Sequence, residues 1–581
     1  MGPGVAAPAL GSATEHRTRV PAAPAAAAVA VLAGLIVLAV VASLSGDVQY
    51  ALGGLRATEG SESFLTTFVH RPLAYRAALA ALDAPARAVG LGPGSLVAYE
   101  AVLRLAAIAA AAAAGWCLWW ALRRHLPRID AATVSGAVGM ALALPPTWDV
   151  LQPDWMGGMF VALAVAAALG PKRAVLAGIL AGLCVVLAVG VKLATISLAP
   201  LAFILVWAVD RRRAGAMAVG AVVWGVGWLA VMLLALPIEW QWVRDMAALN
   251  PNSPIRSGLD ARDRQLLLNA IGSKIVLQPW LIIVPPAIVL LARAAGSLRG
   301  AGGLATLVVA ALAMAVAPII IQGQYYLYHL AALGPAAAAV VALAVARWWR
   351  LAGRPPMLLV APLPLLGLAG ALVLSQPPAT REAWDRPVLL GCAALAVALS
   401  TWAAMPRLRP GRQASDRAHV RLHEVAWLAA AALAILPAVV PTAAWALDPA
   451  ATTWTNAGWA MRSATKHVAY AELRRMIGAD TPVLYLAYGD VPYHLGNPTD
   501  CRYPSPLWVQ RGMDLAYVTQ FASYRDNRNC LASPVPRYLV LQPHWFAIDR
   551  LQPTVRDVLD ARYDCSAALV VDDLAACPRR S

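Results

Sequence analysis

An aspartate and a basic tripeptide lie in the first loop of the chain, where they could act together. Asp47 stands in Ser45-Gly-Asp-Val-Gln-Tyr50 at the end of an apolar stretch, and His70-Arg71-Pro72 follows in the same loop. An unpaired carboxylate beside hydrocarbon is costly, which favours a functional residue. A carboxylate can accept a proton from a hydroxyl group, and a guanidinium can bind two oxygens of one phosphate. The alternative for Asp47 is a solvated carboxylate at a helix end.

Other candidate residues stand in the connections between later apolar stretches. Asp154 lies in Gln152-Pro-Asp-Trp155, and Lys192 ends the segment Gly190-Val-Lys192. The segment Gln324-Tyr-Tyr-Leu-Tyr-His329 contributes three further candidates, which are Tyr325, Tyr326 and His329. Arg256 follows a proline in an irregular, charged stretch.

Each of these residues also has a purely structural explanation. Asp154 could stabilise the first turn of a helix, and Lys192 could extend from a helix end to the membrane interface. His70 could be a packing residue, and Arg71 could bind lipid headgroups. Tyrosines collect at membrane interfaces without any catalytic role. The residues alone leave both explanations open.

The apolar stretches that position these loops are long enough to cross a membrane. The chain is 60% hydrophobic and only 13% charged, a composition that the surface of a soluble protein would not tolerate. We predict an α-helical polytopic membrane protein with about 13 transmembrane helices of roughly 20 residues each. They are placed at 25–45, 96–121, 131–146, 156–170, 174–190, 193–209, 215–236, 278–294, 304–321, 326–346, 357–375, 387–404 and 423–446.

Short basic clusters between the spans predict the orientation of the chain. They run from Arg123 to Arg128, Lys172 to Arg173, Arg211 to Arg213, Arg293 to Arg299, Arg347 to Arg354 and Arg407 to Arg421. Because Lys and Arg gather in cytoplasmic loops, the N-terminus is expected inside and the chain after Ala446 outside. Residues 1–20 are a predicted disordered cytoplasmic tail, and the first span is kept because no convincing cleavage site follows it. The net charge of +16 then reflects orientation in the plasma membrane and contact with membrane lipids, and not nucleic-acid binding.

Three parts of the chain are expected on the outer side. Loops 46–95 and 237–277 of the membrane domain (21–446) are too long to be mere connectors. The second loop is highly charged and could be a mobile gate or a solvated helix rich in salt bridges. Residues 447–581 contain short β-type segments such as Val483-Leu-Tyr-Leu-Ala-Tyr488, which predict a separate extracytoplasmic mixed α/β domain.

The cysteines support an extracytoplasmic position for this domain. It holds four of the seven, Cys501, Cys530, Cys565 and Cys577, whereas the others stand singly in predicted spans. In an oxidising compartment, Cys501 with Cys530 and Cys565 with Cys577 would form two local disulfides. Four cysteines allow three pairings, and free buried thiols are the alternative.

In this arrangement the chain resembles the GT-C superfamily of membrane glycosyltransferases, in particular the branch of aminoarabinose transferase and the protein O-mannosyltransferases. That pattern has an acid after the first span, a His-Lys-Pro-Pro-like element, an acid between spans three and four, and a large loop between spans seven and eight. Asp47, His70-Arg71-Pro72, Asp154 and residues 237–277 match these features. Lys192 and the segment 324–329 match a further basic and a further aromatic element.

The chain departs from this pattern in two places. Arg71 replaces the usual Lys and is followed by a single proline, Pro72. No second acid follows Asp47 directly, which weakens a metal site because Mg²⁺ prefers six oxygen ligands. No cofactor is therefore assigned, and dependence on a divalent cation stays open.

The resemblance implies a GT-C-like fold and transfer of a sugar from a polyprenyl-phosphate donor to a glycan, glycolipid or protein acceptor of the cell envelope. Asp47 and Asp154 would be catalytic, with Asp47 taking the acceptor proton. Arg71 and Lys192 would stabilise the departing phosphate. The remaining candidates would bind substrate, and they are His70, Arg256, Tyr325, Tyr326 and His329.

Other function classes fit the sequence less well. It contains no Walker loop, no Gly-x-Ser-x-Gly elbow and no His-Glu-x-x-His, and its inner loops are too short for a cytosolic nucleotide-sugar site. A transporter or lipid flippase is the main alternative, but such proteins usually show internal repeats and polar broken spans near the midplane. A non-enzymatic scaffold of the cell envelope is a third hypothesis.

Overall fold

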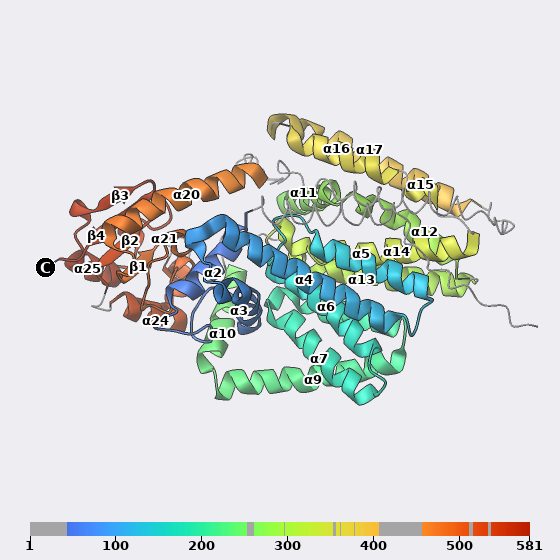
Figure 1. Ribbon diagram of the computed structural model, residues 1–581, viewed down its shortest axis with the longest axis horizontal. Helices are drawn as coiled ribbons and strands as arrows, with labels where there is room; N and C mark the ends of the chain where they lie inside the picture. Colours follow the sequence, from blue (N-terminus) through green and yellow to red (C-terminus); the bar gives the residue numbers. More distant parts are fainter. Residues whose placement is uncertain are drawn as a thin grey trace, which may run out of the picture.

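The computed structural model describes residues 43–252, 261–295, 297–352, 356–360, 362–376, 378–405, 456–510, 515–532 and 536–580. The predicted span at 423–446, most of the span at 25–45, the predicted tail and Arg256 lie outside these residues. The described chain is elongated, with a bundle of long helices and a smaller α/β unit at one end (Figure 1).

Mostly apolar helices of very different length make up the bundle, and their positions follow the hydrophobic stretches of the sequence. They are α4 (Leu96–Leu122), α5 (Arg128–Ala143), α6 (Pro153–Leu169), α7 (Ala174–Gly190), α8 (Leu198–Trp207), α9 (Arg211–Leu234), α12 (Val284–Arg293), α13 (Leu298–Gln322), α14 (Leu333–Ala352), α15 (Met357–Val360), α16 (Pro362–Ser375) and α17 (Pro378–Ala404). Short 3-10 segments precede four of the α-helices, and they are η1 (Pro93–Ser95), η2 (Leu193–Ser197), η3 (Pro279–Ile283) and η4 (Leu327–Leu330).

Every predicted span between residues 96 and 404 coincides with one of these helices or with a broken pair. Among the described residues, 5 helices are long and apolar enough to cross a membrane, and up to 6 if a bent pair counts as one span. Three shorter apolar helices lie at Pro153–Leu169, Ala174–Gly190 and Leu193–Trp207. The chain is therefore a helical, multi-pass membrane protein, whereas the number of about thirteen spans stays a prediction.

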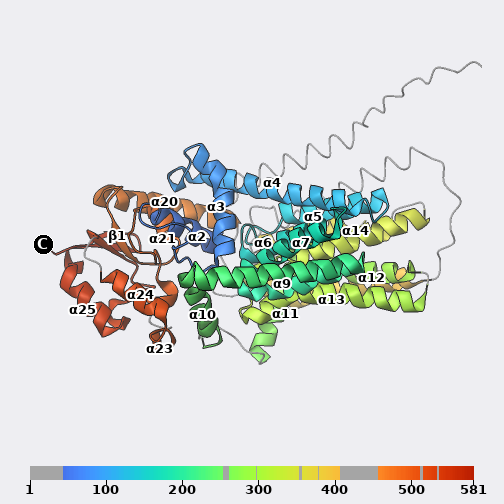
Figure 2. The same ribbon diagram turned by 90° about the horizontal axis from the view of Figure 1, so that it is seen from below.

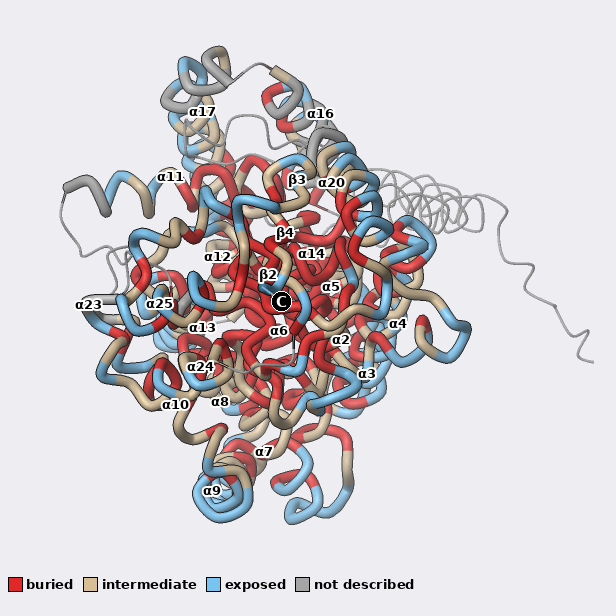
Figure 3. The backbone as a smooth tube through the Cα atoms, turned by 90° about the vertical axis from the view of Figure 1, so that its left-hand side faces the viewer, coloured by how far each residue is buried: buried red, intermediate tan, exposed pale blue. Residues whose placement is uncertain are grey.

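Helices α7 and α9 pack through glycines, so that their backbones touch. A Cβ atom added at Gly182 would overlap the backbone of Gly220, and one added at Gly220 would overlap the backbone of Gly178. Close approach of this kind is how helices associate where the surrounding lipid removes the hydrophobic driving force. The opposite side of α9 is largely exposed (Figure 3), as a lipid-facing helix requires.

The described basic clusters follow or precede the ends of α4, α6, α9, α12 and α14, at the end of the bundle away from the α/β unit (Figures 1 and 2), whereas the cluster from Arg407 to Arg421 lies outside the described residues. Arg213 donates from Nη1 to the carbonyls of Ala168 and Pro171, each at 2.8 Å. Arg350 binds Asp130 through two hydrogen bonds of 2.8 and 2.7 Å. Arginines at helix ends satisfy carbonyls that have no partner within the helix.

Four helices fill the two long outer loops, and they are α2 (Gly46–Ala57), α3 (Leu73–Ala88), α10 (Pro237–Asn252) and α11 (Ala261–Leu277). Helix α10 is not a solvated helix, because Glu239, Trp242 and Asp245 are buried. On α11, Lys274 is buried and pairs with Asp149. These loops therefore carry packed structure over the end of the bundle that adjoins the C-terminal unit.

The C-terminal unit contains a four-stranded sheet in the order β1-β2-β4-β3. Strands β1 (Val483–Leu486) and β2 (Tyr538–Leu541) are parallel, whereas β4 (Leu574–Pro578) is antiparallel to both β2 and β3 (Leu569–Val571). The helices are α20 (Asn456–Ile477), α21 (Val491–Leu495), α22 (Leu507–Gln510), α23 (Leu515–Val518), α24 (Ala522–Leu531) and α25 (Pro553–Arg562), with η6 (Ile548–Arg550) and η7 (Cys565–Ala567). The expected mixture of helix and strand is thus present.

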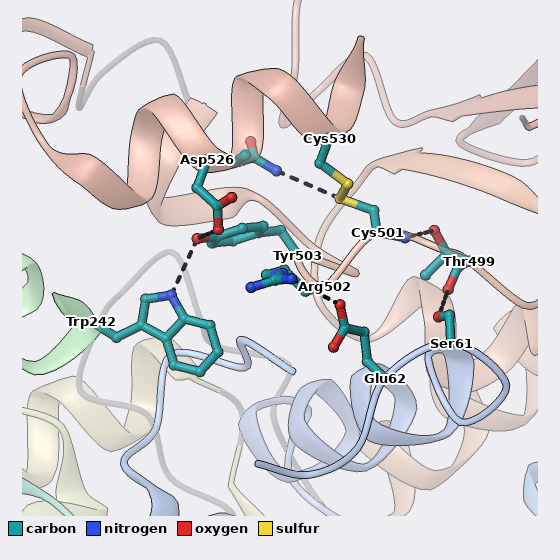
Figure 4. The surroundings of a disulfide bond; sticks show 10 residues. Ser61, Glu62, Trp242, Thr499, Cys501, Arg502, Tyr503, Asp526 and Cys530 are labelled. Atoms are coloured by element: carbon teal, nitrogen blue, oxygen red, sulfur yellow. Dashed lines mark hydrogen bonds and ion pairs between the residues drawn. A yellow bond between two sulfur atoms is a disulfide. The ribbon is translucent and has the colours of Figure 1, made fainter. Parts of the chain in front are cut away.

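Two disulfides stabilise this unit, in the pairing expected from the sequence. Cys501 is joined to Cys530, and Cys565 to Cys577. Figure 4 shows the first bond among contacts that reach other parts of the chain. Trp242 of α10 donates to Tyr503 at 3.1 Å, and Ser61 donates to the carbonyl of Thr499 at 3.0 Å. The unit is therefore bound to both outer loops.

Replacing Gly182 by Ala is expected to force α7 and α9 apart and to destabilise the bundle by about 1–3 kcal/mol, the usual cost of overpacking. The matched control is Gly225→Ala, because a Cβ atom at Gly225 of α9 would meet nothing within 4 Å. Thermal unfolding in detergent should show a lower Tm for Gly182→Ala and an unchanged or higher Tm for Gly225→Ala. Equal Tm values for the two variants would contradict the tight α7–α9 contact.

Candidate active site

A cavity of about 590 Å³ lies between one end of the bundle and the C-terminal unit. The bundle side and outer loops supply Asp47, His70, Arg71, Lys192 and Tyr326 to its lining. Five predicted site residues, from three separate connections of the sequence, therefore meet at one site. Arg256 lies outside the described residues.

Asp47 and Arg71 form an ion pair in the lining of this cavity. Asp47 lies in the first turn of α2, where the helix dipole favours a negative charge. Its Oδ2 atom is 3.4 Å from Nη2 of Arg71, and the two side chains are 29% and 16% exposed. A long, partly solvated ion pair of this kind can exchange partners when another anion enters.

An unusual backbone conformation turns Arg71 toward Asp47. His70 has a φ of 55°, in the left-handed region that non-glycine residues seldom occupy. Its carbonyl accepts from Nη1 of Arg71 at 3.1 Å. Helix α3, which follows, is held by Glu239 of α10, which accepts from the Leu73 backbone at 2.7 Å and from Arg76 at 2.7 Å. The segment from His70 to Arg76 is therefore fixed at both ends.

The His70 ring is packed rather than free to act as a base. It stacks on Phe68 with a centroid distance of 5.6 Å, and its Nδ1 atom lies 3.2 Å from the Tyr50 hydroxyl. Burial, and next the positive charge of Arg71, hold the pKa of His70 well below its usual value. His70 is therefore neutral at physiological pH and can bind a polar group without adding charge.

Lys192 reaches the cavity from a buried cluster with Asp154 and His329. Its Nζ atom lies 3.1 Å from Oδ2 of Asp154 and 2.8 Å from Nδ1 of His329. The Asp154 and His329 side chains are each only 1% exposed, and neither lines the cavity. Asp154 therefore acts on the cavity through the ammonium group of Lys192.

The tyrosines of segment 324–329 divide between two environments. Tyr326 and Tyr328 line the cavity, and their rings are nearly parallel with centroids 5.8 Å apart. The Lys192 ammonium lies 5.4 Å from the centre of the Tyr328 ring, within the range of a cation–π contact. Tyr325 instead packs beside the cluster that contains Ile319 and Leu330. The sequence analysis predicted Tyr325 and not Tyr328 as a site residue, whereas Tyr328 lines the cavity and Tyr325 does not.

A second cavity of about 310 Å³ adjoins the first and shares Arg71 and Lys192 with it. Most of its other lining is apolar, including Phe68, Trp242 and Ile321. Ile321 and Leu193 are also exposed on the bundle surface. The two cations thus stand where an apolar space meets a polar one.

The C-terminal unit forms the other wall of the larger cavity, which sequence reasoning did not assign. Eight lining residues come from it: Arg462, Ser463, Lys466, Tyr488, Asp490, His494, Leu507 and Trp545. No local sequence signal marks these positions, because Trp and Tyr recur throughout this domain and more often fill the core of a small domain. The described residues contain no group of three or more His, Cys, Asp or Glu that could hold a metal ion, so we assign no metal ligand.

Removing the Asp154 charge should leave Lys192 buried without its counterion. We expect Asp154→Asn to cost about 3–5 kcal/mol, as for other buried pairs that lose one partner. The double variant Asp154→Asn with Lys192→Met should recover most of this loss, since no buried charge remains. Thermal unfolding of the two single variants and the double variant measures the coupling, and strictly additive losses would show that the pair is not coupled.

The fold is similar to that of two solved structures of ArnT from Cupriavidus metallidurans. The apo structure aligns with a TM-score of 0.50 and 14% identity, over 95% of this chain and 97% of that chain. The structure bound to undecaprenyl phosphate aligns with a TM-score of 0.51 and 15% identity, over 96% and 98%. Arabinosyltransferase EmbB from Mycobacterium smegmatis aligns with a TM-score of 0.38 and 16% identity, over 78% and 44%, too weakly to bear on the fold.

No protein-family model matches the chain, and no curated protein matches it. The similarity to ArnT nevertheless extends over almost the full length of both chains. This chain thus has the fold of ArnT, in agreement with the fold expected from the resemblance of its sequence motifs.

Proposed function

We propose that the protein is a glycosyltransferase that moves a sugar from a polyprenyl-phosphate-linked donor to an acceptor of the cell envelope. The observation that carries this proposal is the meeting of Asp47, Arg71 and Lys192 at the junction of an apolar and a polar cavity. A lipid phosphate needs both environments, one for its hydrocarbon and one for its charge. The ArnT fold supports the proposal, because one ArnT structure holds undecaprenyl phosphate.

The donor lipid would enter through the apolar cavity beside α10 and α13. Its phosphate would lie between Arg71, which can bind two oxygens at once, and Lys192, which acts as a point charge. The 3.4 Å contact between Arg71 and Asp47 would be exchanged for a charge-assisted bond to the phosphate. The sugar would then point into the larger cavity toward Asp47.

Asp47 would be the general base for transfer. The acceptor hydroxyl attacks the anomeric carbon, its proton passes to the Asp47 carboxylate, and the bond from that carbon to the phosphate oxygen breaks. The negative charge left on the lipid phosphate is stabilised by Arg71 and Lys192. A low effective dielectric beside the bilayer strengthens these interactions.

Asp154 and His329 would serve as positioning residues. Their contacts of 3.1 and 2.8 Å to Nζ hold Lys192 in one place. A cation fixed in advance needs no reorganisation when charge develops on the leaving group. We therefore assign Asp154 an indirect role in the reaction, through Lys192.

The basic clusters support an outward-facing site. They lie at the end of the bundle opposite the cavity (Figure 2), and Lys and Arg favour the cytoplasmic side. The two disulfides of the C-terminal unit fit an oxidising compartment. We propose a multi-pass plasma-membrane protein with a cytoplasmic N-terminus and an extracytoplasmic C-terminal domain.

Removal of the Asp47 carboxylate should abolish transfer. We expect Asp47→Asn to lower the rate at least about 100-fold, within the usual contribution of a general base. The assay follows radiolabelled sugar from polyprenyl-phosphate donors to envelope acceptors, in membranes with matched expression. The control is Asp549→Asn, an exposed aspartate that does not line the cavity. Undiminished labelling with Asp47→Asn would remove this residue from the mechanism.

Binding of the lipid phosphate should depend on the two cations and not on Asp47. We expect Arg71→Gln and Lys192→Met each to weaken the Kd for undecaprenyl phosphate about tenfold, since a charge-assisted bond contributes roughly 1.5–3 kcal/mol. Arg244→Gln is the matched control, because Arg244 lies on the neighbouring α10 with its side chain 61% exposed. Titration of protein in nanodiscs measures these constants. Equal affinities for all variants would exclude the shared edge of the two cavities as the phosphate site.

A further inference from the structure

Part of the cavity wall supplied by the C-terminal unit comes from loops that follow two neighbouring parallel strands. Tyr488 and Asp490 follow β1, and Trp545 follows β2. Loops at the carboxyl ends of adjacent parallel strands converge, and ligands commonly bind there. The C-terminal unit therefore presents its most favourable binding edge to the cavity.

Two aromatic rings form a fixed surface on this wall. The ring centroids of Tyr488 and Trp545 are 4.6 Å apart with an interplanar angle of 34°. Gln542 holds both loops, because its Oε1 accepts from the Tyr488 backbone at 2.8 Å and its carbonyl accepts from the Trp545 backbone at 3.0 Å. Both residues are half-buried, so part of each side chain remains open to a ligand. Such rings offer apolar area at little entropic cost.

Buried polar atoms beside these rings have no partner among the described residues. Asp490 is 3% exposed, and while Oδ2 accepts from Lys466 at 2.9 Å, its Oδ1 atom makes no hydrogen bond. His494 is also 3% exposed, and neither ring nitrogen makes a hydrogen bond. Both residues line the cavity. Buried polar groups without partners are costly, so a site that keeps several is built to receive a polar ligand.

The charge of this group favours hydroxyls over phosphate. Lys466 is neutralised by Asp490, and burial together with the charge of Lys466 lowers the pKa of His494 to about 3. A neutral imidazole offers one donor and one acceptor, and a carboxylate oxygen accepts from hydroxyl groups. Vicinal hydroxyls of a sugar match this combination, whereas an anion would meet the carboxylate of Asp490.

We propose that Tyr488, Asp490, His494 and Trp545 form a subsite for the hydroxyl-bearing ring of an uncharged glycan acceptor. The rings of Tyr488 and Trp545 pack against the sugar, while Asp490 and His494 bind its hydroxyl groups. As an acceptor site this inference rests on the proposed transferase function.

The subsite is fixed relative to Asp47. Gly489, between two residues of the wall, touches Tyr50 of α2 so closely that a Cβ atom would overlap the Tyr50 ring. Burial, and next the negative charge of Asp47, raise the pKa of Tyr488, as expected for groups that face one cavity.

Direct binding of methyl glycosides tests the subsite without any donor lipid. Saturation-transfer NMR on the full chain in nanodiscs would use the methyl glycosides of arabinose, galactose, glucose and mannose, with glucose 1-phosphate as the anionic comparison. The variants are Trp545→Ala and Asp490→Asn. The control is Tyr517→Ala, since Tyr517 is an exposed aromatic residue of the same unit outside the cavity lining. Thermal unfolding and binding of undecaprenyl phosphate show that each variant is folded.

We expect at least one neutral glycoside to bind, and both variants to weaken it tenfold or more while Tyr517→Ala leaves it unchanged. Absence of binding by all four glycosides, equal binding by all variants, or binding of the phosphate ester alone would overturn the subsite. The transferase proposal is tested separately, since it would be contradicted if no sugar were transferred from the polyprenyl-phosphate donor in the labelling assay. Either proposal can therefore fail while the other stands.

Discussion

The structure depends on one close contact, between helix α2 and the C-terminal unit. A Cβ atom at Gly53 of α2 would overlap the backbone of Tyr493, so only glycine permits this approach. The same helix carries Asp47 in its first turn. Its Gln49 donates to Glu100 of α4 at 3.2 Å and to Ser463 of α20 at 3.1 Å. Helix α2 thus connects the bundle to the C-terminal unit and also carries the Asp47 carboxylate. These contacts hold the two walls of the cavity in a fixed relative position.

The second constraint is the cost of placing charge beside hydrocarbon. The positive charge of Lys192 is tolerated because Asp154 and His329 lie within 3.1 Å of its ammonium group. The charge of Arg71 is tolerated because its guanidinium pairs with Asp47 and donates to the carbonyl of His70. The two cations therefore stand fixed at the boundary of the apolar and polar cavities before any ligand arrives. Fixed charges and dipoles of this kind stabilise developing charge more effectively than solvent, which must first reorient.

Much of this arrangement could be predicted from the sequence, because membrane spans impose strong rules. Hydrophobic length located the helices between residues 96 and 404, and the basic clusters indicated that Asp47, Arg71 and Lys192 share one side. Sequence could not show that Asp154 lies behind Lys192, since both stand in outer connections and only packing decides which one faces the cavity. It could not separate Tyr325 from Tyr328 for the same reason. The wall formed by Tyr488, Asp490, His494 and Trp545 depends on strand order and on contact with α2, neither of which has a local sequence signal.

The central claim is that a lipid phosphate binds at the junction of the two cavities. The most direct measurement is an electron cryomicroscopy structure of the chain in nanodiscs with undecaprenyl phosphate. We predict phosphate density within hydrogen-bonding distance of both the Arg71 guanidinium and the Lys192 ammonium, with the hydrocarbon beside Phe68, Trp242 and Ile321 in the smaller cavity. Phosphate density elsewhere, with Arg71 still paired to Asp47, would contradict the account.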